Sequence, residues 1–158
     1  SADILLDIIK YRIKNVLFAA IASPKVFKIL KKNNKKNFFL GGDLGGGGPN
    51  IKILPESVNL INDCAIVNFK SITLIITKYR RPFHYFKDFE NLNIDLTKYK
   101  ILVVKSGYLS SDLKKIRSKS YMVLSDGAVN QNITALTNNF RKKNIFPFFE
   151  KAVFKFDK

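Results

Sequence analysis

The segment NVLFAAI, Asn15–Ile21, constrains the fold of this chain more than any other feature. It is an uncharged, mainly apolar run of strand length, which is typical of a strand buried on both faces. Helical patterns flank it, because Leu5, Leu6, Ile8, Ile9 and Ile13 recur at helical spacing after the capping residue Asp3. On the other side, Ser23 and Pro24 form the N-cap and first-turn proline of a second helix. The sequence therefore predicts a helix, a buried strand and a second helix.

The middle of the chain has a different pattern. The segments FFLGGDL, NIKILPES, CAIVNF and SITLIITKY are short, rich in β-branched or aromatic residues, and separated by Gly, Pro, Asn and Asp. This composition is typical of antiparallel strands joined by turns. We expect a meander of three or four strands between Phe38 and Tyr79.

Beyond the meander, helical and strand patterns alternate again. In chain order we expect a helix near Tyr85–Asn91, a buried strand at Lys100–Ser106, a helix capped by Ser110 or Ser111, a strand at Tyr121–Asp126 and a helix near Asn130–Asn138. A strand, helix and strand in succession favour parallel pairing with a right-handed crossover. With no repeat and no linker, the prediction is one α/β domain over residues 1–158. It has a mixed sheet flanked by helices and an inserted antiparallel β meander.

The stretch GGDLGGGGPN, Gly41–Asn50, holds six of the eight glycines and raises the possibility of a phosphate-binding loop. A Walker loop ends in Gly-Lys-Ser or Gly-Lys-Thr and opens a helix, and a dinucleotide loop also precedes a helix. Here Pro49, Asn50 and a strand-like IKIL follow instead. The sequence favours a flexible connection between two strands, and the run Gly45–Gly48 has no assigned role.

The formal net charge of the 158 residues is +16, which raises the possibility of a nucleic-acid or polyanion partner. The lysines, however, are spread along the whole chain, with one dense run at Lys31–Asn37. The abundance of Lys, Asn, Ile, Phe and Tyr is also what A/T-rich codons would give. A solvated basic surface is therefore favoured, and a basic binding module for nucleic acid or another polyanion remains the alternative.

Few residues have the chemistry of a catalytic or metal site. One cysteine, Cys64, excludes an intrachain disulfide and favours a reduced, cytoplasmic setting, with Cys64 as a packed structural thiol. The one histidine, His84, lies among aromatic residues, and no GxSxG motif supports a triad of His84 with Ser106 and Asp126. No apolar run approaches the ~20 residues of a membrane-spanning helix. We therefore assign no catalytic residue and no metal ligand, and expect no membrane partner.

Two strand ends are better candidates for a site. Lys105, Ser106 and Gly107 end one predicted strand, and Asp126 and Gly127 end the next. Open α/β sheets place their clefts at the carboxyl ends of strands. We expect contacts to a ligand or a partner domain there.

The order of five segments resembles the C-terminal domain of the microcystinase C family of zinc metallopeptidases, which includes a microcystin-degrading enzyme. These segments are NVLFAAIASPKVF, LGGDLGGGGP, IDLTKYKILVVKSG, LSDGAVN and FRKKNIFPF. Lys105 and Ser106 match the family's Lys-Ser pair, and Arg141 and Pro147 match its basic, proline-containing tail. The family's His-Phe after the Lys-Ser pair is replaced here by Leu109 and Ser110.

This resemblance implies a non-catalytic C-terminal domain of a zinc-dependent hydrolase. The zinc ligands would belong to a larger N-terminal catalytic domain of the same parent protein, which would be this chain's partner, and this chain would hold no cofactor itself. The candidate cleft or domain-interface residues are Lys105, Ser106, Asp126 and Arg141. The substrate and the oligomeric state stay open.

Overall fold

The structure is a computed structural model that describes residues 2–34, 36–41, 49–105, 110–116, 119–121, 123, 145–146 and 148. The chain divides into two compact units, Ser1–Tyr121 and Met122–Lys158, and the architecture below is that of the first unit. Within the described ranges, no helix combines the length and the apolar character needed to cross a membrane.

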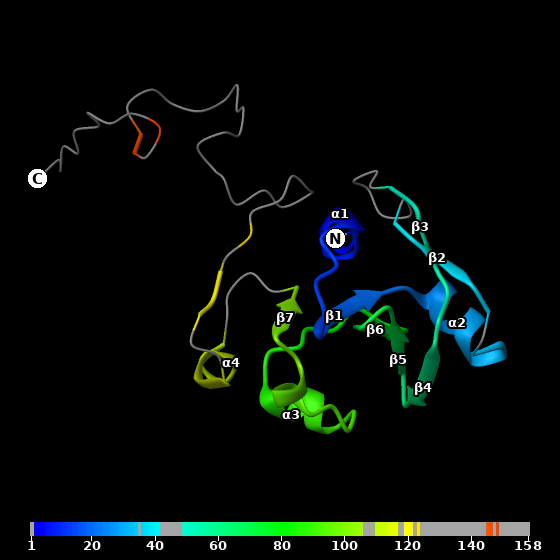
Figure 1. Cartoon of the computed structure of the whole chain (residues 1–158). Coiled ribbons are helices and arrows are strands. Elements are labelled where there is room, and N and C mark those ends of the chain that lie inside the picture. Colours follow the sequence, from blue (N-terminus) through cyan, green and yellow to red (C-terminus); the bar gives the residue numbers. More distant parts are fainter. Residues whose placement is uncertain are drawn as a thin grey trace, which may run out of the picture. The chain divides into compact units, whose positions relative to one another are not determined.

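A five-stranded mixed sheet forms the centre of the first unit (Figure 1). Its strands are β1 (Val16–Ala22), β4 (Ser57–Ile61), β5 (Cys64–Phe69), β6 (Ile72–Thr77) and β7 (Ile101–Val104), in the order β4-β5-β6-β1-β7. β1 pairs in parallel with β6 on one side and with β7 on the other. β4, β5 and β6 are successive antiparallel neighbours. The predicted meander is thus joined to the main sheet through β6.

The two central strands are buried on both faces, as their apolar sequences predict. Val16 and Phe18 of β1 pack into one hydrophobic cluster, whereas Leu17 and Ala19 pack into the other. All six residues of β6 are buried. Each fully buried Val, Leu, Ile or Phe side chain contributes roughly 1.5–3 kcal/mol to stability through the removal of apolar surface from water.

Two layers cover the sheet. The first cluster joins one face to α1 (Ala2–Lys10), α2 (Pro24–Lys32) and a separate antiparallel ribbon of β2 (Phe38–Leu40) and β3 (Ile51–Ile53). The second cluster joins the opposite face to α3 (Phe86–Glu90), the short 3-10 helix η1 (Leu96–Lys98) and α4 (Ser111–Ile116). Figure 1 shows α1 above the sheet, and α3 and α4 below it.

The predicted mixed α/β fold is confirmed, and so is its opening order of helix, strand and helix. Helix α1 begins at Ala2 and includes Asp3, so Asp3 is not its N-cap as expected. Ser23 caps α2, since its hydroxyl oxygen accepts a hydrogen bond of 3.3 Å from the N–H of Val26. Ser110 caps α4 in the same way, through the N–H of Leu113 at 3.4 Å. Strand β1 begins one residue later than expected.

Four predictions need correction or lie outside the described residues. The strand expected to be buried at Lys100–Ser106 is β7, which is the outermost strand of the sheet, so its residues are exposed or only partly buried. Five strands, not three or four, lie between Phe38 and Tyr79, because β2 and β3 form a ribbon of their own. In the predicted strand Tyr121–Asp126, the two residues that the structure describes, Tyr121 and Val123, are not in a strand, and the others lie outside the described residues. The helix predicted near Asn130–Asn138 also lies outside them.

Candidate functional site at the carboxyl edge of the sheet

The three parallel strands β6, β1 and β7 end at the same edge of the sheet, which we call the carboxyl edge. Main-chain hydrogen bonds tie these ends together. The N–H of Ser23 donates to the carbonyl of Thr77 at 3.0 Å, and the N–H of Lys105 donates to the carbonyl of Ala19 at 3.0 Å. Because neighbouring strands lie about 4.8 Å apart, the ends of β6 and β7 are separated by roughly 10 Å. Clefts of open α/β sheets form at such an edge.

Lys105 is the one predicted site residue that the structure describes. It follows β7 directly, its side chain is exposed, and it takes part in neither of the ion pairs formed among the described residues. Its backbone is fixed by the bond to Ala19, so the ammonium group extends into solvent from a defined point. Ser106, Asp126 and Arg141 lie outside the described residues, and their proximity to Lys105 stays a prediction.

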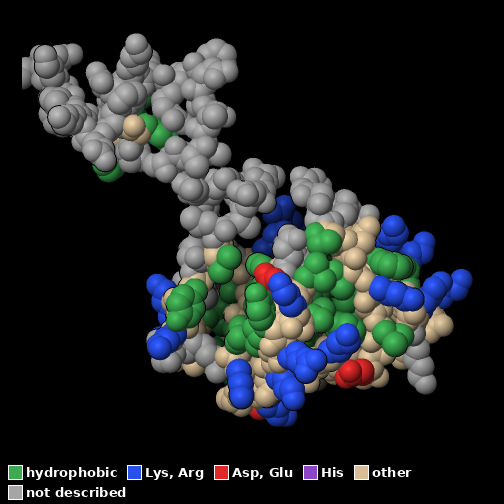
Figure 2. All heavy atoms as spheres, turned by 45° about the horizontal axis from the view of Figure 1, so that its top comes forward, with side chains coloured by type: hydrophobic (Ala, Val, Ile, Leu, Met, Phe, Trp, Pro, Cys, Tyr) green, Lys and Arg blue, Asp and Glu red, His purple; other side chains and the backbone are tan. Residues whose placement is uncertain are grey.

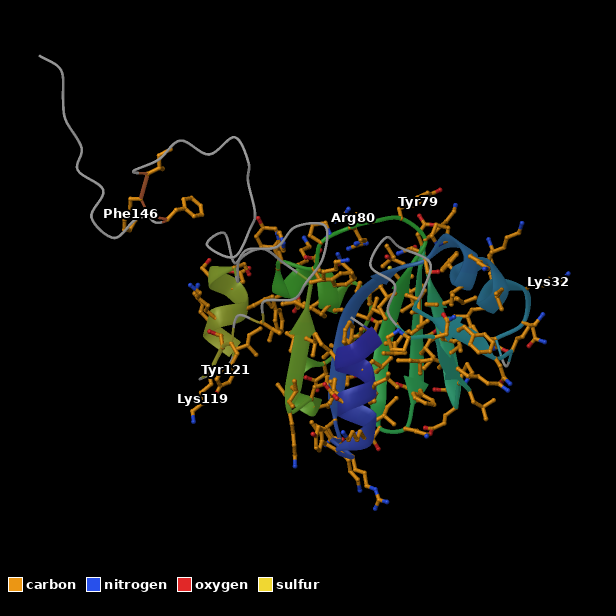
Figure 3. The ribbon with its side chains drawn as sticks, turned by 90° about the horizontal axis from the view of Figure 1, so that it is seen from above. Lys32, Tyr79, Arg80, Lys119, Tyr121 and Phe146 are labelled. Atoms are coloured by element: carbon orange, nitrogen blue, oxygen red, sulfur yellow. The ribbon has the colours of Figure 1, made fainter. Side chains whose placement is uncertain are left out.

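The cationic segment Lys78–Arg81 follows β6 and therefore leaves the sheet at the same edge. It was not predicted to be part of the site, because β6 was expected to belong to the meander, where the end of the strand has no link to Lys105. The signal was present in SITLIIT, because an apolar run without polar alternation indicates a central strand. Figure 3 shows Tyr79 and Arg80 where the chain leaves the sheet after β6.

Lys78 is partly neutralised by its neighbours. Its N–H donates to the carbonyl of Asp63 at 2.9 Å, and its Nζ lies 3.8 Å from Oδ1 of the same residue. Nζ also lies 4.6 Å from the ring centroid of Tyr79. The hydrogen bond to Tyr79, with a smaller contribution from the Asp63 carboxylate, raises the pKa of Lys78. Lys78 is therefore a cation throughout the physiological range.

Arg81 has a structural role. Its guanidinium donates to Oδ1 of Asp88 at 3.3 Å and lies 5.0 Å from the ring centroid of Phe83. The other carboxylate oxygen of Asp88 accepts the N–H groups of His84 and Tyr85 at 3.0 and 2.9 Å. Asp88 thus holds Arg81 and the start of α3 in one arrangement.

Arg80 and Lys105 are two cations of this edge that contribute to neither described ion pair. Arg80 is exposed, and the exposed ring of Tyr79 precedes it. A guanidinium offers paired N–H donors to a carboxylate, and an ammonium adds a mobile positive charge. The carboxyl edge can therefore bind an anionic group. On the face shown in Figure 2, however, Lys and Arg side chains are spread over the visible surface, so positive charge as such is not special to this edge.

His84 and Cys64 lie in structural positions. The hydroxyl of Ser110 donates to the main-chain carbonyl of His84, which links the start of α4 to the segment before α3. Cys64 is only 1% exposed. Burial is the main cause that raises the pKa of its thiol. The interpretation of Cys64 as a packed structural thiol is confirmed.

The described residues do not form a metal centre, since no three His, Cys, Asp or Glu side chains among them converge on one point. The glycine-rich stretch connects β2 to β3, as expected for a link between strands. Gly41 begins this link with a φ of 102°, a value that favours glycine. Residues 42–48 lie outside the described residues, so the expected mobility of the link stays a prediction.

The chain is similar to a known protein family over much of its length. Residues 45–139, about three fifths of the chain, match a protein-family model described as the MlrC C-terminus. The matched range contains the segment Lys78–Arg81, Lys105, Ser106 and Asp126, whereas Arg141 follows it. No curated protein matches the chain.

Proposed function

The chain belongs to the MlrC C-terminus family, so it is the C-terminal domain of an MlrC-like protein, and we propose that it completes the substrate cleft of a zinc-dependent hydrolase. In this proposal the chain is not catalytic. It packs against the N-terminal catalytic domain of the same parent protein. Lys105 lies in the wall of the cleft, with Ser106, Asp126 and Arg141 as further interface or cleft residues.

The position of Lys105 carries the proposal. It follows β7, the outermost strand of the sheet and a parallel neighbour of β1, at the carboxyl edge where α/β sheets bind ligands, and its side chain is exposed. Arg80 emerges at the same edge after β6. Two cations outside the described ion pairs are suited to a substrate carboxylate or to an acidic side chain across a domain interface.

The framework beneath these cations favours binding over chemistry. The N–H of Lys105 is bonded to Ala19, and the N–H of Ser23 is bonded to Thr77, so the edge is held before any partner arrives. Preorganised groups bind more tightly because less conformational freedom is lost on association. The described residues do not fit a zinc site, and in this proposal the zinc is held by the catalytic domain.

Substitution of Lys105 in the full parent protein tests this role. We expect Lys105→Ala to lower turnover or domain association about tenfold, as the loss of one charge-assisted contact would. Association is measured by calorimetry between the separately expressed domains, and turnover is measured on the intact protein. Ser106→Ala is tested in parallel.

Lys87→Ala is the matched control, because Lys87 is an exposed lysine on α3, on one face of the sheet rather than at its carboxyl edge. It should leave both measurements unchanged. Wild-type turnover together with wild-type association in both the Lys105 and the Ser106 variants would exclude the cleft-wall role. Zinc analysis of the parent protein, with and without the N-terminal domain, tests where the metal is bound.

A further inference from the structure

We propose a second binding site, at the opposite edge of the sheet, for a small aliphatic carboxylate. A pocket of about 310 Å3 lies between the end of α1 and the start of β6. It is near the small end of the usual size range of ligand pockets, roughly 300–1,000 Å3. This site does not depend on the function proposed for the carboxyl edge.

Four isoleucines give the pocket an apolar lining. Ile8, Ile9 and Ile13 come from α1 and the residues after it, and Ile72 is the first residue of β6. Ile8 and Ile72 are buried in the first hydrophobic cluster, and Ile9 and Ile13 pack against it. A hydrocarbon group placed against these isoleucines would lose part of its contact with water, which favours binding.

Cations and a hydroxyl supply the polar part of the lining. Arg12, Lys14, Lys70 and Ser71 complete the pocket, and none of its lining residues is acidic. The three cations are exposed, and the described ion pairs involve none of them. The nearby carboxylate of Glu56 accepts the main-chain N–H of Lys70 at 3.0 Å, so it serves the turn backbone. The positive charge and the apolar lining of the pocket are complementary to an anion with an apolar tail.

The backbone at Arg12 has a left-handed conformation that glycine would adopt with less strain. The N–H of Ile13 donates to the carbonyl of Ile8 at 3.0 Å, and that of Arg12 donates to Ile9 at 3.1 Å. These two bonds form a Schellman motif, in which the residue at the position of Arg12 adopts a left-handed conformation and is usually glycine. Arg12 has a φ of 52°. The backbone conformation at this helix end therefore does not favour an arginine.

The turn between β5 and β6 also has residues other than glycine or asparagine at left-handed positions. Lys70 and Ser71 have φ values of 47° and 62° and connect the paired residues Phe69 and Ile72. A two-residue turn with both φ values positive prefers Asn-Gly. The carbonyl of Ser71 accepts the N–H of Asn15 at 3.0 Å, which fixes the turn beside β1. Two cations of one pocket thus occupy positions that the backbone favours for Gly and Asn.

A helix dipole offers an alternative explanation for the positive charge, since cations stabilise the carboxyl end of a helix. Lys10 already supplies such a charge in the last turn of α1. Lys70 belongs to a different element, and the dipole effect decays within about one turn. The dipole accordingly does not explain why both Arg12 and Lys70 line the same apolar pocket.

The ligand class follows from the lining. An aliphatic group would contact the isoleucines while a carboxylate accepts charge-assisted hydrogen bonds from the rim. This chemistry is shared by a free medium-chain carboxylic acid and by the carboxyl terminus of a peptide that ends in an aliphatic residue. Both sources are included in the test.

Titration of the 158-residue chain, followed by two-dimensional NMR, tests the site. The probes are octanoate, an acetylated dipeptide ending in leucine, octylammonium and inorganic phosphate. We expect saturable shifts of the amides of Ile13, Lys70 and Ile72 with octanoate, with the peptide, or with both, and the better probe identifies the source. Absence of saturable shifts with both, or equal binding of octylammonium, would overturn the proposal.

Two variants separate binding from folding. Arg12→Gly and Lys70→Asn place favoured residues at left-handed positions, so we expect unchanged or higher thermal stability and a Kd about tenfold higher for each. Lys87→Gln, a charge removal on α3, is the control and should bind as the wild type does. Wild-type affinity in both pocket variants would overturn the proposal.

Discussion

The main-chain N–H of Lys105 donates a hydrogen bond of 3.0 Å to the carbonyl oxygen of Ala19. Ala19 pairs with Val104, the last residue of β7, so this bond extends the parallel pairing one residue beyond the strand. It fixes the backbone of Lys105 and leaves its side chain exposed. The contribution of the Lys105 N–H to stability can therefore be tested separately from the contribution of its side chain to binding.

Substitutions of Lys105 should separate these two contributions. Lys105→Pro removes the N–H and should lower the free energy of unfolding by about 1–3 kcal/mol, since a buried carbonyl loses its donor. Lys105→Ala keeps the N–H and should change the free energy of unfolding by less than ~0.5 kcal/mol. Urea unfolding measures the stability of both variants. Equal stability of the two would show that the hydrogen bond to Ala19 does not stabilise the fold.

Asp88 is expected to stabilise the start of α3 and the segment before it. Its carboxylate accepts two main-chain N–H groups and pairs with Arg81. Asp88→Ala should lower the free energy of unfolding by about 1–2 kcal/mol, as the loss of a capping residue does. Glu90→Ala, an exposed acidic residue on the same helix, is the control. Equal losses in the two variants would contradict the capping role.

The first elements of the fold could be predicted because their signals are local. Ser23 followed by Pro24 marks the start of α2, and the apolar run before them marks β1. Each signal lies within a few residues of the element that it predicts. Lys105 could be placed at a strand end for the same reason.

The rest of the site depends on pairing between distant segments. Parallel pairing of β6 with β1 brings Arg80 to the edge where Lys105 lies, and turn signals near β6 indicate only its antiparallel partner β5. The pocket between the end of α1 and the start of β6 could not be predicted for a further reason. Arg12 and Lys70 occupy left-handed positions where local rules predict Gly or Asn, so nothing in the sequence marked a helix end or a tight turn there.

Cys64 should make stability depend on pH in the alkaline range. Burial raises the pKa of its thiol in the folded state above the ordinary value of 9.0. The unfolded chain therefore releases the proton first, and the stability contributed by the protonated thiol, complete below pH 9, is lost as pH rises above it. Urea midpoints between pH 8 and pH 10 should fall more steeply for the wild type than for Cys64→Ala. Parallel pH profiles would contradict this assignment.

Two threonines of β6 provide a matched pair for the cost of a buried hydroxyl. Thr73 donates to Oδ1 of Asn68 at 2.8 Å and accepts from the hydroxyl of Tyr99 at 3.1 Å. Thr77, only 1% exposed, has a hydroxyl without a hydrogen-bond partner among the described residues. Both lie on the same strand with their side chains on the same face, four residues apart.

Replacement of each by valine should therefore have opposite effects. Thr77→Val removes an unsatisfied buried hydroxyl and should raise the free energy of unfolding by up to about 1 kcal/mol. Thr73→Val removes a donor for Asn68 and an acceptor for Tyr99, and should lower it by about 1–3 kcal/mol. Thermal and urea unfolding of the two variants measure the difference, with Thr77→Ala as a check on the packing of the γ-methyl group. If Thr77→Val proved as destabilising as Thr73→Val, the hydroxyl of Thr77 would have to make a stabilising hydrogen bond in solution.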